Sequence, residues 1–494
     1  MAASTPRYLG PVPHPAIGVR IPDIFANGIL SAFETRRTAG GLILSCTREA
    51  APKYVIDSAP GKYSPTLGHT GLSISDYILK SSRMARRRNI VVEIEADHLI
   101  VGSYIQAVQR LFDATSEVEM NDEQISNSLS FVFDAIDEAT STGLVNAFTV
   151  DTTSLVDLRV ERYSQEELAA RFSDEISNGR NLLEEYSREF HLSWIDGSLY
   201  TVRFRKDEMM RIALESKRSL ETCFKIYSHI RERMEEEPFG FELTLDELPR
   251  QSGTELLYYL REWRKMGGHA DFVAPNIGFR KRADFQGDLV AFGKQVSFLA
   301  ALAYGWGSLL SIHSGSGESP YTGKGHGVYR AIVDATGGKV KYKISGVYYE
   351  LLMDLLAKSR SAKHRRLFEI ILNGVTSFWE EQILRNTPLA DSTARTMFLA
   401  YKKEPKSRRM RLHSRSDFFR HYSFIALNLR DKGGKRYIKD ELLALYHNDS
   451  RFRRIVDREV KGLTLRLIDG MHFGDNLPHV AMHEGSGGRT KTSC

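Results

Sequence analysis

Ionisable side chains follow several short β-rich runs of this chain, at the point where each run ends. The six are Asp97, His98, Asp151, Glu247, His313 and Lys343. A divalent metal ion with open coordination positions needs three or four nitrogen or oxygen ligands that converge from separate segments. Proton transfer needs a positioned carboxylate, histidine or lysine nearby. The joint placement of these residues therefore predicts a metal or acid–base site.

Each of these residues alone has an ordinary structural alternative. A lone histidine such as His313 is more often a satisfied structural residue than a ligand. Asp97 could cap a following helix, and Lys343 could pair with a carboxylate. A seventh candidate, His421, stands at the start of its β-rich run beside a basic stretch and could be a surface residue. A catalytic or metal-binding role is favoured because these residues stand together at the ends of β-rich runs.

The runs that carry these residues alternate with longer segments of helical periodicity. About eight β-rich runs are found: Tyr54–Asp57, Val91–Ala96, Ala147–Val150, Phe241–Leu245, Ala270–Ala274, Leu309–Ile312, Val340–Ile344 and Tyr422–Leu427. Among the helical segments, Glu255–Lys265 has apolar residues at helical spacing and is followed by two glycines. About eight strand–helix units favour an α/β fold with a closed (β/α)8 barrel, whose active site lies at the carboxyl ends of the strands.

The length of 494 residues exceeds what a single core of about 250–300 residues holds, so the barrel needs additions. We expect an irregular N-terminal region over 1–85 and a barrel over 86–470. A helical insertion is expected around 152–238. The segment 471–494 is rich in glycine, histidine and serine, and we expect it to be a flexible tail.

Composition narrows the class of protein. Apolar residues make up 42% and charged residues 26%, which is typical of a soluble globular chain. A net charge of +6 over this length is a weak bias and argues against a dedicated nucleic-acid binder. Three separated cysteines support neither a disulfide framework nor a cysteine zinc site. With no secretory signal and no apolar run long enough to span a membrane, we expect a cytoplasmic protein and leave homo-oligomerisation open.

Two further segments resemble binding elements. The glycine-rich stretch 314–327 follows a strand and contains Lys324, but its spacing departs from the phosphate-binding loop, so we expect no nucleotide. It suits a loop over the barrel mouth, where Lys324 could meet an anionic substrate. The basic run 402–420, with aromatic residues nearby, could bind nucleic acid, although a solvated surface is the favoured interpretation.

Several segments together resemble the tagaturonate epimerase family of hexuronate catabolism. They are Glu95–His98, Thr149–Thr152, Leu245–Glu247, Ala274–Leu289, Ser311–Gly317, Thr336–Gly346 and His421–Phe424. The resemblance spans roughly residues 90–465, and SIHSGS followed by TGGKVKYK is its most specific part. It implies a divalent-metal-dependent epimerase, with Zn²⁺, Ni²⁺ or Mn²⁺ as the ion, that interconverts D-tagaturonate and D-fructuronate or a related keto-sugar acid.

The resemblance also implies roles for individual residues. The metal or substrate ligands would be His98, Glu247, His313 and His421, and the groups for proton transfer or substrate hydrogen bonding would be Asp97, Asp151 and Lys343. The mouth would be lined by Asn276, Arg280, Ser314 and Ser316. Arg280 is the candidate for gripping the substrate carboxylate, because a guanidinium binds it bidentately. The sequence departs from the family after SIHSGS and at Ile344–Ser345, which bears on the substrate.

Inversion of a carbon β to a keto group cannot proceed by simple loss of an α-proton. Retro-aldol cleavage, rotation of the fragment and re-addition would achieve it, and a Schiff base on Lys343 is a variant. A different metal-dependent aldolase or ketose isomerase on the same barrel is the first alternative. A non-catalytic or nucleic-acid-binding relative is the second.

Overall fold

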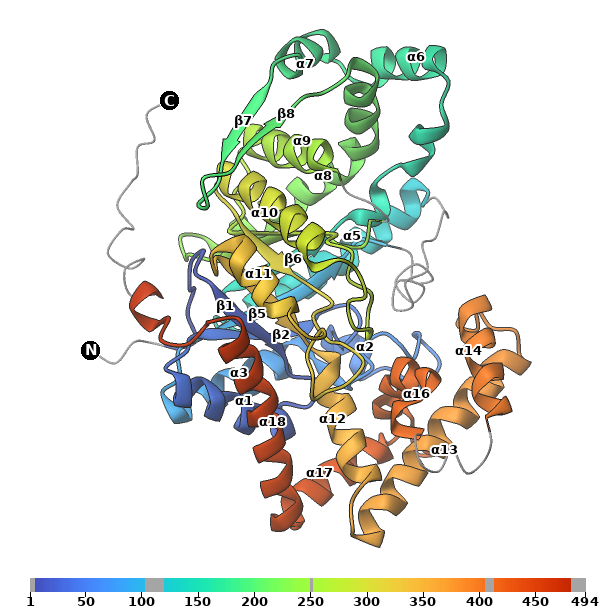
Figure 1. The fold of residues 1–494 in the computed structure, drawn as a ribbon. Coiled ribbons are helices and arrows are strands. Elements are labelled where there is room, and N and C mark those ends of the chain that lie inside the picture. Colours follow the sequence, from blue (N-terminus) through green and yellow to red (C-terminus); the bar gives the residue numbers. More distant parts are fainter. Residues whose placement is uncertain (1–4, 103–119, 249–251, 405–412, 481–494) are drawn as a thin grey trace.

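The computed structural model describes residues 5–102, 120–248, 252–404 and 413–480. Eight parallel strands close into a barrel in the order β1-β12-β11-β10-β9-β6-β5-β2 (Figure 1). Their bounds are β1 His14–Gly18, β2 Gly40–Ser45, β5 Val92–Ile100, β6 Ala147–Asp151, β9 Gly240–Leu245, β10 Phe272–Pro275, β11 Leu309–Ile312 and β12 Val340–Ile344. The predicted (β/α)8 class is confirmed.

Strand β9 shows why these sequences form a barrel. Phe241 points outward and stacks on Trp263 of helix α9 (Gly253–Lys265), with ring centroids 5.4 Å apart. The next residue, Glu242, points inward and forms ion pairs with lysines of β12 across the barrel. Because successive side chains of a strand alternate between faces, the apolar residues meet the helices and the polar ones fill the interior.

The barrel begins much earlier than the sequence analysis expected. β1 and β2 lie in the first 85 residues and close the barrel by pairing with β12 and β5, so that region is not irregular. The run at Tyr54 is instead a short helix, α2 (Lys53–Ile56), and the run at Tyr422 ends helix α16 (Asp417–Tyr422) and continues as a 3₁₀ turn, η5 (Ser423–Asn428). Strand β1 contains Pro15 and is five residues long, which hides its strand character among the prolines of the N-terminus.

Helices surround the barrel in the expected alternation. They include α1 Pro22–Arg36, α3 Ile74–Arg88, α5 Asp122–Thr140, α8 Lys206–Met234, α9, α10 Leu289–Gly305, α11 Val328–Thr336 and α12 Gly346–Ala357. Several start at a side-chain cap: Ser252 of α9 forms a capping box with Glu255, and Asp288 caps α10. Capped starts fix where each loop over the barrel mouth ends.

Two additions extend the barrel at opposite ends of the view in Figure 1. Between β6 and β9 the chain forms α6 (Gln165–Glu175), α7 (Gly179–Tyr186) and the antiparallel hairpin of β7 (Phe190–Ser193) and β8 (Leu199–Val202) before α8. After α12 it forms α13 (Ala362–Leu384), α14 (Ser392–Lys403), α16, η5, α17 (Tyr437–Asn448) and α18 (Ser450–Gly470). Helix α18 packs along α1, so the C-terminal addition returns to the barrel.

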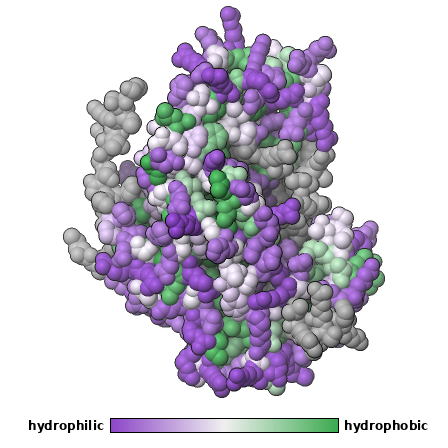
Figure 2. Space-filling model, in the orientation of Figure 1, coloured by the Kyte–Doolittle hydropathy of each residue, from purple (hydrophilic) through white to green (hydrophobic). Residues whose placement is uncertain are grey.

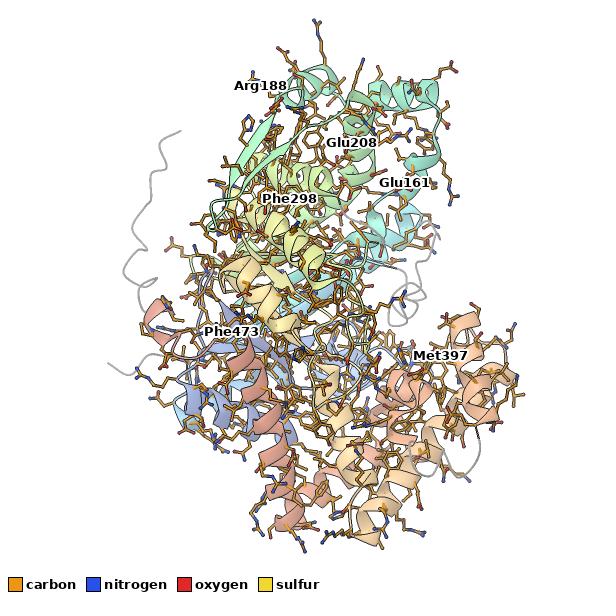
Figure 3. All side chains as sticks on the ribbon, in the orientation of Figure 1. Glu161, Arg188, Glu208, Phe298, Met397 and Phe473 are labelled. Atoms are coloured by element: carbon orange, nitrogen blue, oxygen red, sulfur yellow. The ribbon has the colours of Figure 1, made fainter. Side chains whose placement is uncertain are left out.

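The segment that follows α18 is packed rather than loose over the residues that the structure describes. Met471, Phe473 and Val480 are buried, and Phe473, labelled in Figure 3, lies just beyond the carboxyl end of α18. Asn476 donates to the backbone carbonyls of Pro13 and Ala39 at the foot of the barrel. The expectation of a flexible tail is therefore wrong for 471–480, and 481–494 lie outside the described residues.

Figure 2 shows mostly hydrophilic side chains over one face of the molecule, with small apolar patches between them. Within the described ranges, no helix combines the length and the apolar character that a membrane span requires.

Candidate active site at the barrel mouth

A cavity of about 160 Å³ lies at the carboxyl ends of the barrel strands. Its lining comes from the strand ends or following loops of β1, β2, β5, β9, β10, β11 and β12. Among the described residues, only β6 contributes nothing to this lining. This is the end at which (β/α)8 enzymes carry their active sites.

An irregularity in β5 brings two consecutive side chains into the cavity. The pairing of β5 with β6 shifts between Ala96 and Leu99, so the strand bulges at Asp97 and His98. His98 has a φ of 47°, a left-handed conformation that is rare for a residue with a side chain. Consecutive residues of a regular strand point to opposite faces, whereas a bulge re-aims one of them. Both Asp97 and His98 therefore line the cavity.

Three residues from three strand ends meet as a candidate metal site. His98, Asp246 and His313 each offer one ligand atom, and these atoms lie within 4.8 Å of one another. The two imidazole rings are 5.1 Å apart between centroids. Two histidines and one carboxylate that leave other positions open form a common catalytic metal set.

The second nitrogen of each histidine is held by a carboxylate. His98 Nδ1 donates to Asp97 Oδ1 at 3.0 Å, and His313 Nε2 donates to Glu242 Oε1 at 2.6 Å. Metal-binding histidines in proteins show this arrangement, because the carboxylate fixes the ring and its tautomer. It leaves His98 Nε2 and His313 Nδ1 to face a metal.

Unpartnered buried atoms also fit a metal at this place. His313 Nδ1 and Asp246 Oδ1 are buried and make no hydrogen bond to a described residue, although His313 Nδ1 lies 3.4 Å from the other oxygen of Asp246. Buried polar atoms without a partner are costly and rare, so each needs an explanation. A divalent cation bound between the three side chains would satisfy both atoms.

The charges of the site would favour a bound cation only after His313 has lost its proton. Burial opposes the charged form of His313, but Asp246 and Glu242 outweigh it and raise its pKa to about 10. Burial likewise acts against the ionised form of Asp246, while His313 and His98 hold the pKa of that carboxyl well below its usual range. A metal ion bound here would have to displace the His313 proton, and its affinity would then depend on pH.

Lys343 lies at the base of the cavity within a group of carboxylates. Its Nζ donates to Glu95 at 2.5 Å and to Asp97 at 2.9 Å, and it lies 3.0 Å from Glu242. Burial alone would lower the pKa of Lys343, but Asp97, Glu242 and Glu95 raise it above its ordinary value. The amine therefore stays protonated and serves as a hydrogen-bond donor, whereas a base or a Schiff base requires the neutral amine.

Of the four ligands that the sequence analysis expected, the cluster contains His98 and His313. Glu247 lines the cavity, but it pairs with Lys281 at 3.1 Å and its neighbour Asp246 takes the ligand position. His421 lies on helix α16 rather than at a strand, and its Nδ1 donates to the Asp417 carbonyl. Burial and the nearby Arg282 lower the pKa of His421 to about 4.

Asp151 occupies the end of β6 as predicted, but the cavity lining does not include it. Its carboxylate accepts hydrogen bonds from the backbone N–H and the hydroxyl of Thr153. The side-chain amide of Asn276 donates to the Leu248 carbonyl, and its side-chain oxygen accepts from the Gly278 N–H. These two hydrogen bonds hold the turn of the backbone after β10. Both residues therefore organise the chain around the mouth.

Lys324 and Arg280 also differ from their expected roles. Lys324 is buried, and its Nζ donates to the backbone carbonyls of Arg280, Ser314 and Ser316. It ties the glycine-rich loop to the loop after β10 and does not line the cavity at the barrel mouth. The Arg280 side chain is exposed and does not line the cavity, whereas Ser314 and Ser316 do.

Sequence reasoning missed Asp246 as a candidate ligand. It also missed the buried partners Glu95, Glu242 and Lys341 and the cavity residues Arg48 and Glu49. Strand periodicity carried the signal for the first four. If Glu242 faces the interior, strand alternation places Thr244 and Asp246 there as well, whereas Glu247 reaches the cavity from the loop beyond the end of β9. The same rule selects Glu95 with Asp97, and Lys341 with Lys343. Arg48 and Glu49 lie in the loop after β2, a strand that the sequence analysis did not recognise.

Comparison with known proteins gives three findings. The sequence profile of tagaturonate epimerase (UxaE) matches residues 132–456. Solved structures of fructuronate-tagaturonate epimerase UxaE from Cohnella laeviribosi, native and in complexes with glycerol, superpose with TM-scores of 0.62–0.63. The aligned regions are 16% identical and cover 94% of this chain and 83% of the solved chain. At this identity the similarity supports a common fold. A search of curated proteins finds no match.

Proposed function

The chain belongs to the tagaturonate epimerase family, which makes it an enzyme of the isomerase class, and from this premise we propose the reaction and its residues. The proposed activity is metal-dependent interconversion of D-tagaturonate and D-fructuronate, or of a closely related keto-sugar acid. The observation that carries this proposal is the cluster of His98, Asp246 and His313 at the barrel mouth. A divalent ion held there would act as a Lewis acid towards the keto oxygen of the substrate.

Arg48 is the proposed anchor for the substrate carboxylate, in place of Arg280. Its side chain lines the cavity, and its ion-pair partner Glu247 is 3.9 Å away, so the guanidinium has donors to spare. A bidentate guanidinium–carboxylate pair adds geometric selection to charge. Arg48→Lys is expected to raise KM for a uronate about tenfold with a smaller change in kcat, because the charge stays and the fork is lost. An unchanged KM would contradict this assignment.

Glu247 is the proposed proton carrier. Among the other cavity carboxylates, Asp97 is paired with His98 and Lys343, Glu49 with Arg20 at 2.5 Å, and Asp246 belongs to the candidate metal cluster. Glu247 lies in the same lining beside Arg48, the proposed anchor of the substrate. In the retro-aldol route Glu247 takes the proton from the hydroxyl on the carbon to be inverted, and the bond from that carbon to the carbon beside the keto group breaks. The aldehyde turns, the bond re-forms on its other face, and the proton returns. Lys343 stays protonated and stabilises negative charge.

The proposed partner is a small sugar acid in a cytoplasmic setting, without nucleic acid. The basic run 402–420 was the candidate surface for nucleic acid, and its residues 405–412 lie outside the described residues. Phe418, Phe419 and Tyr422 are buried in the core and are not available to stack on bases. Lys402 pairs with Glu380 at 2.9 Å.

The test is product analysis by NMR after incubation of the protein with D-tagaturonate or D-fructuronate. Interconversion that EDTA abolishes, and that Zn²⁺, Ni²⁺ or Mn²⁺ restores, would support the proposal. Solvent deuterium at the inverted carbon would rule out the retro-aldol route in favour of proton exchange. Bound metal with cleavage or isomerisation products, but no epimer, would replace the proposal with an aldolase or a ketose isomerase.

A further inference from the structure

A second and larger cavity lies outside the barrel mouth. It has a volume of about 720 Å³ and lies between the loop after α2, helix α13, the turn η5 and the start of α17. Small-molecule sites in proteins have volumes of about 300–1,000 Å³. We propose that this cavity binds a small organic phosphate, held by Arg430 and Arg436, that acts as an effector of the enzyme.

The two arginines carry charge that no carboxylate among the described residues neutralises through an ion pair. Both line the cavity, and among the described residues neither lies within ion-pair distance of a carboxylate. Two carboxylates, Asp57 and Asp440, act on the pKa of Arg436 from a distance. Asp57 is paired with Lys53 at 3.2 Å, and Asp440 is paired with Lys435 at 3.4 Å. Burial and the charge of Arg430 lower the pKa of Arg436 to about 10. An anion between the two guanidinium groups would relieve this repulsion.

Two backbone carbonyls and the Asn428 side chain orient the arginines and leave other N–H donors of each guanidinium for a ligand. Arg436 donates through Nε to Asn428 and through Nη2 to the Ile56 carbonyl, and Arg430 donates through Nη1 to the Ser58 carbonyl. Each guanidinium carries five N–H donors, so most remain for a ligand. Gly71 makes room for this arrangement, since a Cβ there would lie 2.5 Å from Arg436 Cδ. Two oriented guanidinium groups match the several oxygens of a phosphate.

The remaining walls suit the organic part of such a ligand. Tyr63, Phe378 and Tyr437 contribute aromatic surface, and Ile370 and Leu67 contribute aliphatic surface. One carboxylate, Glu381, also lines the cavity, but it is paired with Arg385 at 2.8 Å. An anion with an apolar group therefore fits better than inorganic phosphate alone.

Two chain segments connect this cavity to the active site. Leu67 lines the second cavity, and His69, two residues further, lines the catalytic one. The same holds across η5: Ile425 lines the second cavity, and its neighbour Phe424 contacts the His69 ring with centroids 4.7 Å apart. A ligand that moves Leu67 or Ile425 would displace His69 at the catalytic cavity, which is the physical basis for an effect on turnover.

The binding test uses isothermal titration calorimetry on the full chain and does not depend on the proposed reaction. The probes are phenyl phosphate, inorganic phosphate and benzoate. Phenyl phosphate is expected to bind at least tenfold more tightly than the other two. Equal binding of benzoate would overturn the choice of phosphate, and no binding of any probe would overturn the site.

Variants on the exposed face of α13 localise the binding without disturbing the arginine contacts. Ser377→Asp adds a negative charge to the cavity lining and is expected to weaken phenyl phosphate binding at least tenfold. Ser377→Asn and Lys432→Ala, an exposed charge on the loop between the two arginines, are the matched controls and should bind as the parent does. Equal affinity in Ser377→Asp would place the ligand elsewhere and overturn the assignment.

The effector role rests on the proposed function and is tested separately, with the metal-loaded enzyme. Phenyl phosphate is expected to change KM or kcat of epimerisation at least twofold in the parent and not in Ser377→Asp at the same concentration. Binding without a kinetic change in an active enzyme would overturn the effector role. An inactive enzyme that still binds phenyl phosphate would instead refute the proposed function alone.

Discussion

The mouth of the barrel and the layer beneath it contain the same kinds of residue and differ in how completely these are paired. Below the mouth, Lys341 lies 2.7 Å from Glu95, 3.2 Å from Glu93 and 3.3 Å from Glu242. At the mouth, Asp246 Oδ1 is buried with no hydrogen-bond partner among the described residues, and His313 Nδ1 lies 3.4 Å from Asp246 Oδ2 without a hydrogen bond. Glu242 Oε2 below the mouth also makes no hydrogen bond, but the Lys341 ammonium lies 3.3 Å from it. A carboxylate beside a buried cation supports the fold, whereas a buried polar atom without a partner is available for a ligand.

The two layers are also connected. Glu242 accepts from His313 on one oxygen and lies beside Lys341 on the other. Glu95 contacts Lys341 and Lys343. The inner layer therefore fixes the carboxylates that orient the histidine and the lysine above it, and the substitutions below separate ligand, orienting and supporting roles.

Removal of a ligand should have the largest effect. Asp246→Ala is expected to abolish stoichiometric metal binding and to lower kcat about a thousandfold, since the Lewis acid is lost. Glu247→Gln, one residue further, should keep the metal and lose turnover. Metal content by elemental analysis, measured beside kcat, distinguishes the two. Retained metal in Asp246→Ala would contradict the ligand set.

The Asp246–Glu247 pair also shows how far sequence reasoning reached. Alternating strands and helices predicted the barrel class, and β11 and β12 match the predicted runs residue for residue. Strand polarity then placed Asp97, His98, His313 and Lys343 at one end. Those inferences need only local pattern and the rule that parallel strands share a carboxyl edge.

What local pattern did not supply was the orientation of each side chain. The bulge that turns both Asp97 and His98 inward depends on the pairing of β5 with β6, which is a tertiary feature. His421 stands directly before a run that is β-rich by composition, yet it lies on a helix because Phe418 and Tyr422, four residues apart, pack together in the core. Lys324 resembled a phosphate-binding residue, but three backbone carbonyls take its donors.

Breaking the inner layer should cost stability. Lys341→Met leaves Glu93, Glu95 and Glu242 buried without their shared cation, and the free energy of unfolding is expected to fall by about 3–5 kcal/mol. Lys339→Met, at a partly exposed position just before β12, is the control and should change it by less than about 0.5 kcal/mol. Adding Glu95→Gln to Lys341→Met should recover part of the loss. Equal stability of Lys341→Met and the parent in urea would contradict the supporting role.

Removing an orienting group should weaken metal binding and leave the fold intact. Asp97→Asn replaces the carboxylate that accepts from His98 Nδ1, and the metal dissociation constant is expected to rise 10–100-fold. The midpoint of thermal unfolding of the metal-free protein should stay within a few degrees of the parent. Competition with a chromophoric chelator measures the affinity. An unchanged dissociation constant would make Asp97 a substrate contact rather than a positioning residue.

The smallest effect concerns Glu215, a buried carboxyl with no cation within ion-pair distance among the described residues. Glu93 is buried beside Lys341 and His14, which outweigh the effect of burial and lower its pKa to about 2. Glu215 on α8 is buried as well, but burial, Glu255 and Glu161 raise its pKa to about 8. Below about pH 4.5 both the folded and the unfolded chain hold the Glu215 proton, so its ionisation does not lower the free energy of unfolding there. As pH rises from 4.5 to 8, the unfolded chain releases the proton first, and stability declines.

Glu215→Gln removes this dependence. The variant should unfold at the same temperature as the parent at pH 5 and a few degrees higher at pH 8, where we expect a gain of about 1–3 kcal/mol. Glu221→Gln, on the exposed face of the same helix and paired with Lys217 at 3.2 Å, is the control and should show no such difference between the two pH values. A constant difference between Glu215→Gln and the parent across this range would mean that Glu215 is ionised in the fold. A buried carboxyl would then ionise even without a paired cation, and the cost of burying charge would not explain why the barrel carboxylates are paired with lysines.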